Sequence, residues 1–181
     1  MSKNGLILLT PTSIAYTGTS ATVSANGSVS FSACSSLSLN GVFSADYDNY
    51  MVVAWTKHTT GTQPGYLRLR AGGTDNSTAS SYVRQNIEVN GTVIAAGRVT
   101  DTRANLFAPC NNPLDGTIIN FYGPYLAQPT AMRSITQVGI NGAYIADGAA
   151  THNQSVAYDG FTMYVVSGVY GGRVAVYGMR K

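Results

Sequence analysis

The C-terminal segment Val156–Lys181 constrains the fold more than any other part of the chain. Two runs rich in Val, Tyr, Phe and Met, at 161–166 and 173–177, flank a Gly-rich stretch at 168–172. Two β-type runs joined by a Gly-rich connection are typical of a β-hairpin. We therefore predict that this segment is a hairpin and that the chain finishes inside a sheet.

Similar short runs recur along the rest of the chain, and helical periodicity is almost absent. Three of the Asn-Gly pairs in the sequence, at 26–27, 90–91 and 141–142, lie between predicted strands and have the residue types of tight hairpin turns. The segment 147–153 is rich in small residues and is predicted to be a loop. The predicted strands are 6–9, 14–16, 22–24, 29–33, 36–39, 50–56, 66–70, 86–89, 93–96, 118–122, 134–140 and 143–145, followed by the two C-terminal runs.

About a dozen short strands at this spacing indicate an all-β fold. We predict an antiparallel two-sheet β-sandwich, with jelly-roll topology favoured over an immunoglobulin-like arrangement because of the number of strands. The chain of 181 residues is of a size for one domain. We expect an N-terminal arm over 1–12 and a single β-sandwich domain over 13–181.

Two of the predicted strands suggest how the core is built. The run Tyr50–Thr56 is nearly continuously apolar, so we expect it to lie deep in the core with Trp55 as its bulkiest side chain. The run Tyr66–Arg70 follows, and we expect the two to pair as a meander. Arg68 and Arg70 alternate with leucines, which favours a solvated sheet face over an anion-binding patch.

The composition excludes several classes of protein. Charged residues make up 10% of the chain, against about 25% in ordinary soluble proteins, while 44% is hydrophobic. The net charge of +3 is small and the arginines form no run, which gives little support to nucleic-acid binding. No apolar run is long enough for a secretory signal or a membrane span, so we expect a soluble protein made in a cytoplasm.

Candidate metal ligands are few. Two cysteines, Cys34 and Cys110, permit one disulfide, although their surroundings favour buried free thiols. Neither His58 nor His152 has the neighbours that a metal site requires. We predict no metal and no cofactor.

A catalytic set is equally hard to assemble. Asp46 and Asp48 flank Tyr47, and paired carboxylates can bind Ca²⁺ or act in acid–base catalysis. A loop cap ahead of the Tyr50 strand is the favoured interpretation, because further ligands are not near in sequence. We predict that the protein is not an enzyme.

Tyrosine is abundant, with 12 copies, and most are expected to line sheet faces as ordinary β-formers. Tyr122 and Tyr125 bracket a Gly-Pro loop, where tyrosines can anchor a protein interface or stack on sugars. The apolar residues Leu6, Ile7, Leu8 and Leu9 stand ahead of Pro11 and could add a strand to a neighbouring protein. We take these six residues as candidate interface residues.

Several short motifs occur in a fixed order from Phe43 onward. They are FSADYDNYMVV at 43–53, LRLRAGGT at 67–74, SY at 81–82, INFYGP at 119–124 and RVAVYG at 173–178. In this order they resemble a group of virion proteins from tailed phages of cyanobacteria and other marine bacteria. The resemblance implies a β-sandwich on the outside of a virion, either a capsid decoration (cement) protein or the distal domain of a tail fibre.

A stand-alone domain of this length fits a decoration protein better than a fibre. The resemblance then implies a homotrimer that binds the major capsid protein on the outer capsid surface, with no nucleic-acid or membrane partner. The alternative is a receptor-binding tail protein that recognises host glycan through loop tyrosines. A glycan-cleaving enzyme is the least favoured, because only eight acidic residues are present and no pair among them is convincing.

Overall fold

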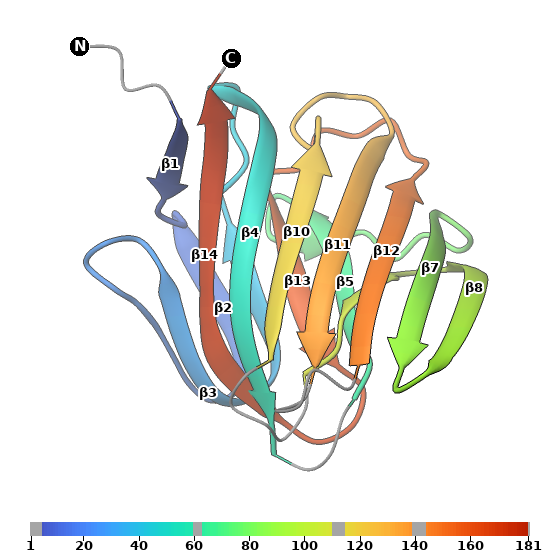
Figure 1. Cartoon of the computed structure of the whole chain (residues 1–181). Helices are drawn as coiled ribbons and strands as arrows, with labels where there is room; N and C mark the ends of the chain where they lie inside the picture. The colour runs from blue at the N-terminus through green and yellow to red at the C-terminus, as the bar shows by residue number, and fades with distance from the viewer. Residues whose placement is uncertain (1–4, 60–62, 110–114, 139–143, 181) are drawn as a thin grey trace.

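The computed structural model describes residues 5–59, 63–109, 115–138 and 144–180 and shows an all-β protein (Figure 1). Every regular element in these ranges is a strand. The described residues include no helix that is long and apolar enough to cross a membrane. The strands are β1 (Leu6–Leu9), β2 (Ser13–Val23), β3 (Val29–Asn40), β4 (Tyr47–His58), β5 (Gly65–Ala71), β6 (Thr74–Asp75), β7 (Tyr82–Asn90), β8 (Val93–Asp101), β9 (Ala104–Phe107), β10 (Gly116–Tyr122), β11 (Thr130–Val138), β12 (Tyr144–His152), β13 (Gly160–Val165) and β14 (Tyr170–Arg180).

The strands form two antiparallel layers (Figure 1). The large sheet has the order β1-β14-β4-β10-β11-β12-β7-β8, and the small sheet behind it has the order β2-β3-β13-β5, with β6 and β9 both paired to β5. The two sheets join where β14 also pairs with β3. The predicted antiparallel β-sandwich of jelly-roll type is confirmed. Its two layers are parts of one curled sheet, which is continuous through the pairing of β14 with β3.

The core lies between the sheets and is centred on aromatic side chains from both. Phe43, in the loop before β4, contacts Tyr50, Phe121 and Phe161, with ring centroids 4.6, 5.2 and 5.7 Å away. The Tyr50 hydroxyl donates to the Ser44 carbonyl at 2.8 Å, so this buried ring keeps a partner for its polar atom. The cluster therefore ties β4 and β10 of the large sheet to β13 of the small one.

Two predicted Asn-Gly hairpins are confirmed. β2 pairs with β3 across Asn26-Gly27, and β7 pairs with β8 across Gly91. Positive φ angles of +95° at Gly27 and +59° at Gly91 explain why glycine stands at these turns. β11 and β12 also pair as predicted, while their Asn141-Gly142 turn lies outside the described residues.

The prediction of a C-terminal hairpin is wrong in its pairing. Both strands exist as β13 and β14, yet they do not bond to each other. They pair one after the other with the same edge of β3, because β2 occupies its other edge. The Gly-rich connection, with Gly168 at φ +68°, lets the chain continue along this edge of β3 from one strand to the next. A Gly-rich connection of this kind permits a hairpin but does not require one.

Two other local predictions fail for similar reasons. β4 and β5 form no meander, because β4 belongs to the large sheet and β5 to the small one. The segment 147–153, predicted as a loop, is largely strand β12, which lies between β11 and β7. Its small residues suit a strand over which a groove opens, as described below.

Arg70 also departs from expectation. The solvated face predicted for the two arginines of β5 is wrong at this position, because Arg70 is buried. Its guanidinium forms a salt bridge with Asp75 and donates to polar atoms on neighbouring segments. Those acceptors are Thr162 Oγ1 at 2.7 Å, Ser38 Oγ at 3.0 Å, Asn40 Oδ1 at 3.0 Å and the Gly73 carbonyl.

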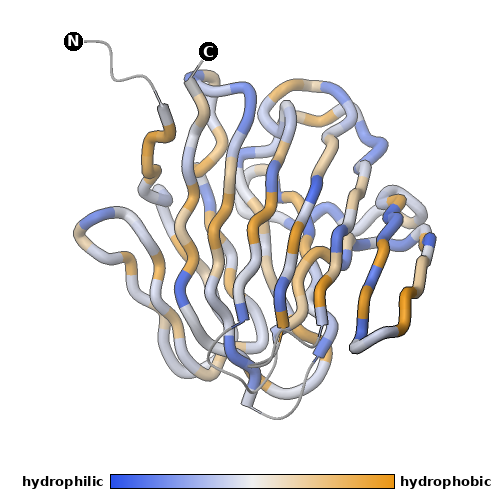
Figure 2. Tube along the Cα trace, in the orientation of Figure 1, coloured by the Kyte–Doolittle hydropathy of each residue, from blue (hydrophilic) through white to orange (hydrophobic). Residues whose placement is uncertain are grey.

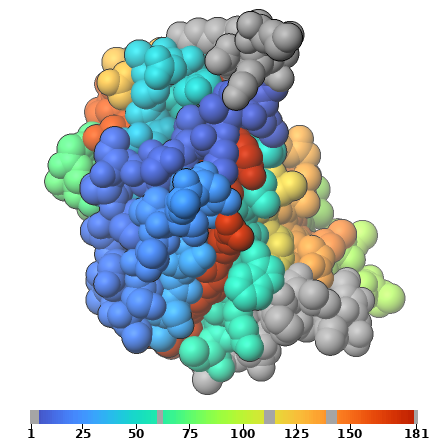
Figure 3. Space-filling view, turned by 90° about the vertical axis from the view of Figure 1, so that its left-hand side faces the viewer, coloured from blue at the N-terminus to red at the C-terminus, as the bar shows by residue number. Residues whose placement is uncertain are grey.

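The N-terminal segment contains a strand of the domain's own sheet. Leu6–Leu9 forms β1, which pairs antiparallel with Met179–Val176 of β14. Figure 3 shows the N-terminal strands in blue beside the red β14, at the edge of the sandwich. Leu6 is exposed, whereas the next three residues are half-buried. An intermolecular role for these residues stays a prediction.

Cys34 is buried as a free thiol, as predicted, and its Sγ lies 3.3 Å from the Ser20 carbonyl oxygen. Cys110 lies outside the described residues.

Candidate functional site: the outer face of the large sheet

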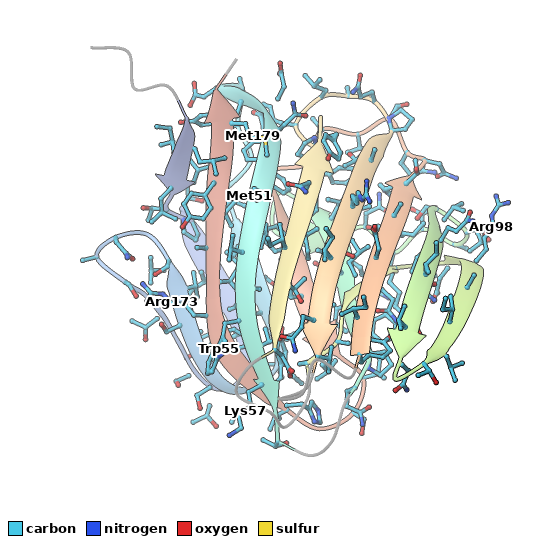
Figure 4. The ribbon with its side chains drawn as sticks, viewed as in Figure 1. Met51, Trp55, Lys57, Arg98, Arg173 and Met179 are labelled. Carbon is cyan, nitrogen blue, oxygen red and sulfur yellow. The ribbon has the colours of Figure 1, made fainter. Side chains whose placement is uncertain are left out.

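β4 presents apolar side chains on both of its faces. Tyr50, Val52 and Ala54 are buried in the core, on one face of the strand, because successive side chains of a strand point to opposite faces. Trp55 lies on the other face and is 45% exposed, so the prediction that it sits in the core is wrong. Figure 4 shows Met51 and Trp55 on the side of the sheet that faces away from the core.

The outward side chains of neighbouring strands continue this surface. Val53, Ile118 and Ile135 stand opposite one another on β4, β10 and β11, and the same row reaches Ile87 on β7 through Asp147. The next row runs from Trp55 through Gly116 and Gln137 to Ile145, Val89 and Ile94. We define the apolar band as Val53, Trp55, Ile87, Ile94, Ile118, Ile135 and Ile145, which are 39% to 73% exposed.

Such a surface is unusual for an antiparallel sheet that faces water. One face normally packs on the core while the other is polar. Here branched aliphatic residues and a tryptophan extend from β4 to β8, and Figure 2 shows apolar segments on these strands. Contiguous exposed apolar surface on a soluble domain commonly marks a site that another molecule covers.

Charges on this face lie mostly at its margins. Lys57, Arg98 and Arg173 project from the outer face at the ends of the band (Figure 4). Within the band, Arg133 Nη2 contacts Asp147 Oδ2 at 2.6 Å and Arg133 Nε contacts Asp147 Oδ1 at 3.2 Å. These hydrogen bonds from Arg133 to Asp147 raise the pKa of the guanidinium and satisfy the carboxylate that interrupts the apolar row. The face is therefore apolar in its interior and cationic at its rim.

The predicted tyrosines lie near one end of this face. Tyr122 ends β10 and Tyr125 is in the following loop, and both are exposed. Gly123 between them has φ +65° and donates its backbone N–H to the Asp48 carbonyl at 2.8 Å, which fixes the loop against the start of β4. Their role as interface residues stays a prediction.

Sequence reasoning missed the apolar band. A signal was present, since the runs MVVAW at 51–55 and TII at 117–119 are apolar at positions of both parities. A continuous apolar run predicts a strand buried on both sides, as we expected for Tyr50–Thr56, whereas in the structure one side is exposed.

The inner face of the same sheet contains a second candidate site. A pocket of about 490 Å³ opens where β11, β12 and β7 extend past the small sheet, and it is lined by polar residues of β7 and β11 and by β9. We call it the inner groove.

The acidic pair considered from the sequence belongs to no metal-binding cluster within the part of the chain that the structure describes. Asp46 Oδ2 accepts a hydrogen bond from Ser44 Oγ at 3.2 Å, as expected of a loop cap. Over the described ranges, no group of three or more His, Cys, Asp or Glu residues is placed to hold a metal ion.

Comparison with known proteins returns a similarity of shape alone. No family model and no curated protein matches the chain. The C-terminal CBM6 domain of LamC, a marine laminarinase from Zobellia galactanivorans, is 12% identical with a TM-score of 0.37, covering 96% of this chain and 99% of its own. The SPRY domain of human HERC1 is 10% identical with a TM-score of 0.35, covering 98% and 99%.

A seed lectin of Lotus tetragonolobus is 9% identical with a TM-score of 0.30, covering 94% of this chain and 95% of its own. At these values the likeness carries no argument about function. None of these three is a virion protein, so the resemblance to phage proteins stays a prediction.

Proposed function

We propose that the protein is a non-catalytic structural protein of a tailed-phage virion, a capsid decoration protein that binds the major capsid protein through the outer face of its large sheet. The single observation that supports this role is the apolar band, which spans β4 to β8 and is exposed on the outer face of the large sheet. Binding would remove these side chains from water, which stabilises a complex by roughly 25 cal/mol per Å² of apolar surface.

The chemistry of the face suits a protein partner. Its interior holds aliphatic side chains and a tryptophan, with an internally paired Arg133–Asp147 and further cations at the rim. Protein interfaces commonly combine a buried apolar centre, which includes aromatic residues, with a polar rim. The low charge of the whole chain fits a protein whose surface is covered by other proteins in an assembly. The expected homotrimer would place three such faces on one capsid site.

Rebinding to heads stripped of this protein tests the proposal. Ile135→Asp and Trp55→Asp each place a charge in the apolar band, and we expect capsid occupancy to fall at least about tenfold for each, which corresponds to about 1.4 kcal/mol. Thr22→Asp is the matched control, because Thr22 is exposed on β2 of the other sheet. Because all three positions are exposed, the variants should fold. Equal occupancy by the band variants and the control would refute the proposed binding face.

A further inference from the structure

The inner face of the large sheet changes character from one end to the other. Under the small sheet it is apolar, with Val52 on β4 and Ile119 on β10 fully buried. Across β11, β12 and β7 the same face carries Ser134, Gly148 and Asn86 in one row, with Gly97 of β8 completing it. A sheet that only built a core would continue with apolar residues there.

The next row of the inner face again combines polar side chains on β11 and β7 with small residues on β12 and β8. Thr136, Ala146, Glu88 and Ala95 stand opposite one another on β11, β12, β7 and β8. Small residues of β12 thus form a floor, and hydroxyl, amide and carboxylate groups of β11 and β7 form the two sides. The pocket of about 490 Å³ falls within the size range of small-molecule sites.

One polar atom at this site lacks a partner although it is buried. Asn86 is 9% exposed, and its Nδ2 donates to Glu88 Oε1 at 2.5 Å. Only the NH₂ end of the amide can donate to a carboxylate, so this contact fixes the orientation of the side chain. Asn86 Oδ1 then has no hydrogen-bond partner among the described residues. A buried acceptor without a partner costs about 1–3 kcal/mol. Because this oxygen is enclosed by protein atoms, the accessible acceptor beside it is the Glu88 carboxylate.

The surrounding groups define the kind of ligand. Glu88 also hydrogen-bonds Tyr144, and burial together with this contact raises the pKa of the tyrosine, which stays a neutral donor. Arg84, Asn90 and Asn105 add further donors and acceptors around the same pocket. A ligand with many closely spaced hydroxyl groups, each able to donate and accept, matches this set. A lipid would leave these groups unpaired, and a nucleic acid would require more cationic charge than Arg84 supplies.

We propose that the inner groove is a saccharide-binding site, in which the half-exposed Glu88 carboxylate accepts hydrogen bonds from sugar hydroxyls above the floor of Ala146 and Gly148. This inference does not rest on the proposed capsid role, because the groove and the apolar band occupy opposite faces of the sheet. It also differs from sugar binding through Tyr125, which does not line the groove.

The test uses the full chain and observes its backbone amides by NMR. Maltotriose, cellotriose and laminaritriose are titrated separately to about 20 mM, which saturates a site whose Kd is about 1 mM. We expect at least one trisaccharide to shift amide signals of β7 and β12 in a saturable manner. Glu88→Ala removes the accessible acceptor and Ala146→Leu fills the floor, and each should weaken the binding at least about tenfold.

Gln85→Ala is the matched control, because Gln85 is the neighbour of Asn86 on β7 and is exposed on the opposite face. It should leave the affinity unchanged. The proposal is overturned if no trisaccharide shifts these signals, or if Ala146→Leu, with an unchanged melting temperature, binds as well as the wild type. Shifts that glycerol or inorganic phosphate reproduces equally would also overturn it.

Discussion

At the scale of single residues, Arg70 combines burial with full pairing. A buried charge is tolerated only where several partners replace the water it has lost, and Arg70 has Asp75 and a ring of polar acceptors. Arg70→Met would leave the Asp75 carboxylate without its cation. We expect the free energy of unfolding to fall by about 3–5 kcal/mol in guanidinium chloride denaturation. Arg133→Met, which breaks an exposed pair, should leave the denaturation midpoint unchanged.

His152 makes the stability sensitive to mild acid. It is buried against Tyr82, with ring centroids 4.2 Å apart, and burial lowers its pKa below the ordinary value of 6.5. Near pH 6 the imidazole of His152 is therefore protonated to a greater extent in the unfolded chain than in the folded chain. We expect the free energy of unfolding to decrease as the pH falls from 7.5 to 5.5, above the range in which carboxylates titrate.

The measurement is chemical denaturation at three pH values in that window. The dependence on pH should become flatter in His152→Gln. An equally steep dependence in that variant would assign the effect to another group.

At the scale of elements, the junction of β14 with its neighbours requires glycine. Gly172 has φ +149°, and a Cβ added there would lie 2.0 Å from the Trp55 carbonyl oxygen. Gly172→Ala should lower the free energy of unfolding by about 3 kcal/mol, because backbone must move to relieve the contact. Gly72→Ala provides the comparison, since Gly72 has φ +56° but faces open space. There we expect a loss of about 1 kcal/mol from the backbone conformation alone.

β1 covers an edge of β14 that would otherwise be free to pair with another chain. Deletion of residues 1–12 removes this strand and the contact of Leu9 with the core. We expect the truncated domain to stay folded, with a lower melting temperature and a tendency to self-associate that gel filtration detects. A truncated chain that remains monomeric would show that the exposed edge of β14 does not pair with a second chain.

Strand positions were largely predictable from the sequence, while their partners were not. Alternation is a local property, and it located β4, β5, β10, β13 and β14 within a few residues. Pairing depends on residues far apart in the chain, as when β13 and β14 both bond to β3. For the same reason, the continuous apolar run of β4 did not show which of its faces is buried, and only the position of the small sheet decides that Trp55 is outside. The polar lining of the inner groove likewise comes from strands separated in sequence.

At the scale of the whole molecule, the proposed role predicts where the protein resides and how many copies assemble. Virions separated into heads and tails should contain this chain in hundreds of copies on the heads, as the many equivalent sites of a capsid require. Quantitative mass spectrometry of the two fractions measures this. About a dozen copies on the tails would instead favour the receptor-binding alternative. Native mass spectrometry of the purified protein should give the mass of a homotrimer.

The place of β14 in the sandwich also bears on how the protein is made. This strand bonds to β1, β3 and β4, so it joins the two sheets although it is the last strand in the chain. During synthesis the earlier strands leave the ribosome first, and their apolar faces have no complete partner until residue 180 has emerged. The nascent chain must therefore remain unaggregated until β14 has been synthesised. Because the chain carries little charge, we expect it to depend on chaperones during this interval.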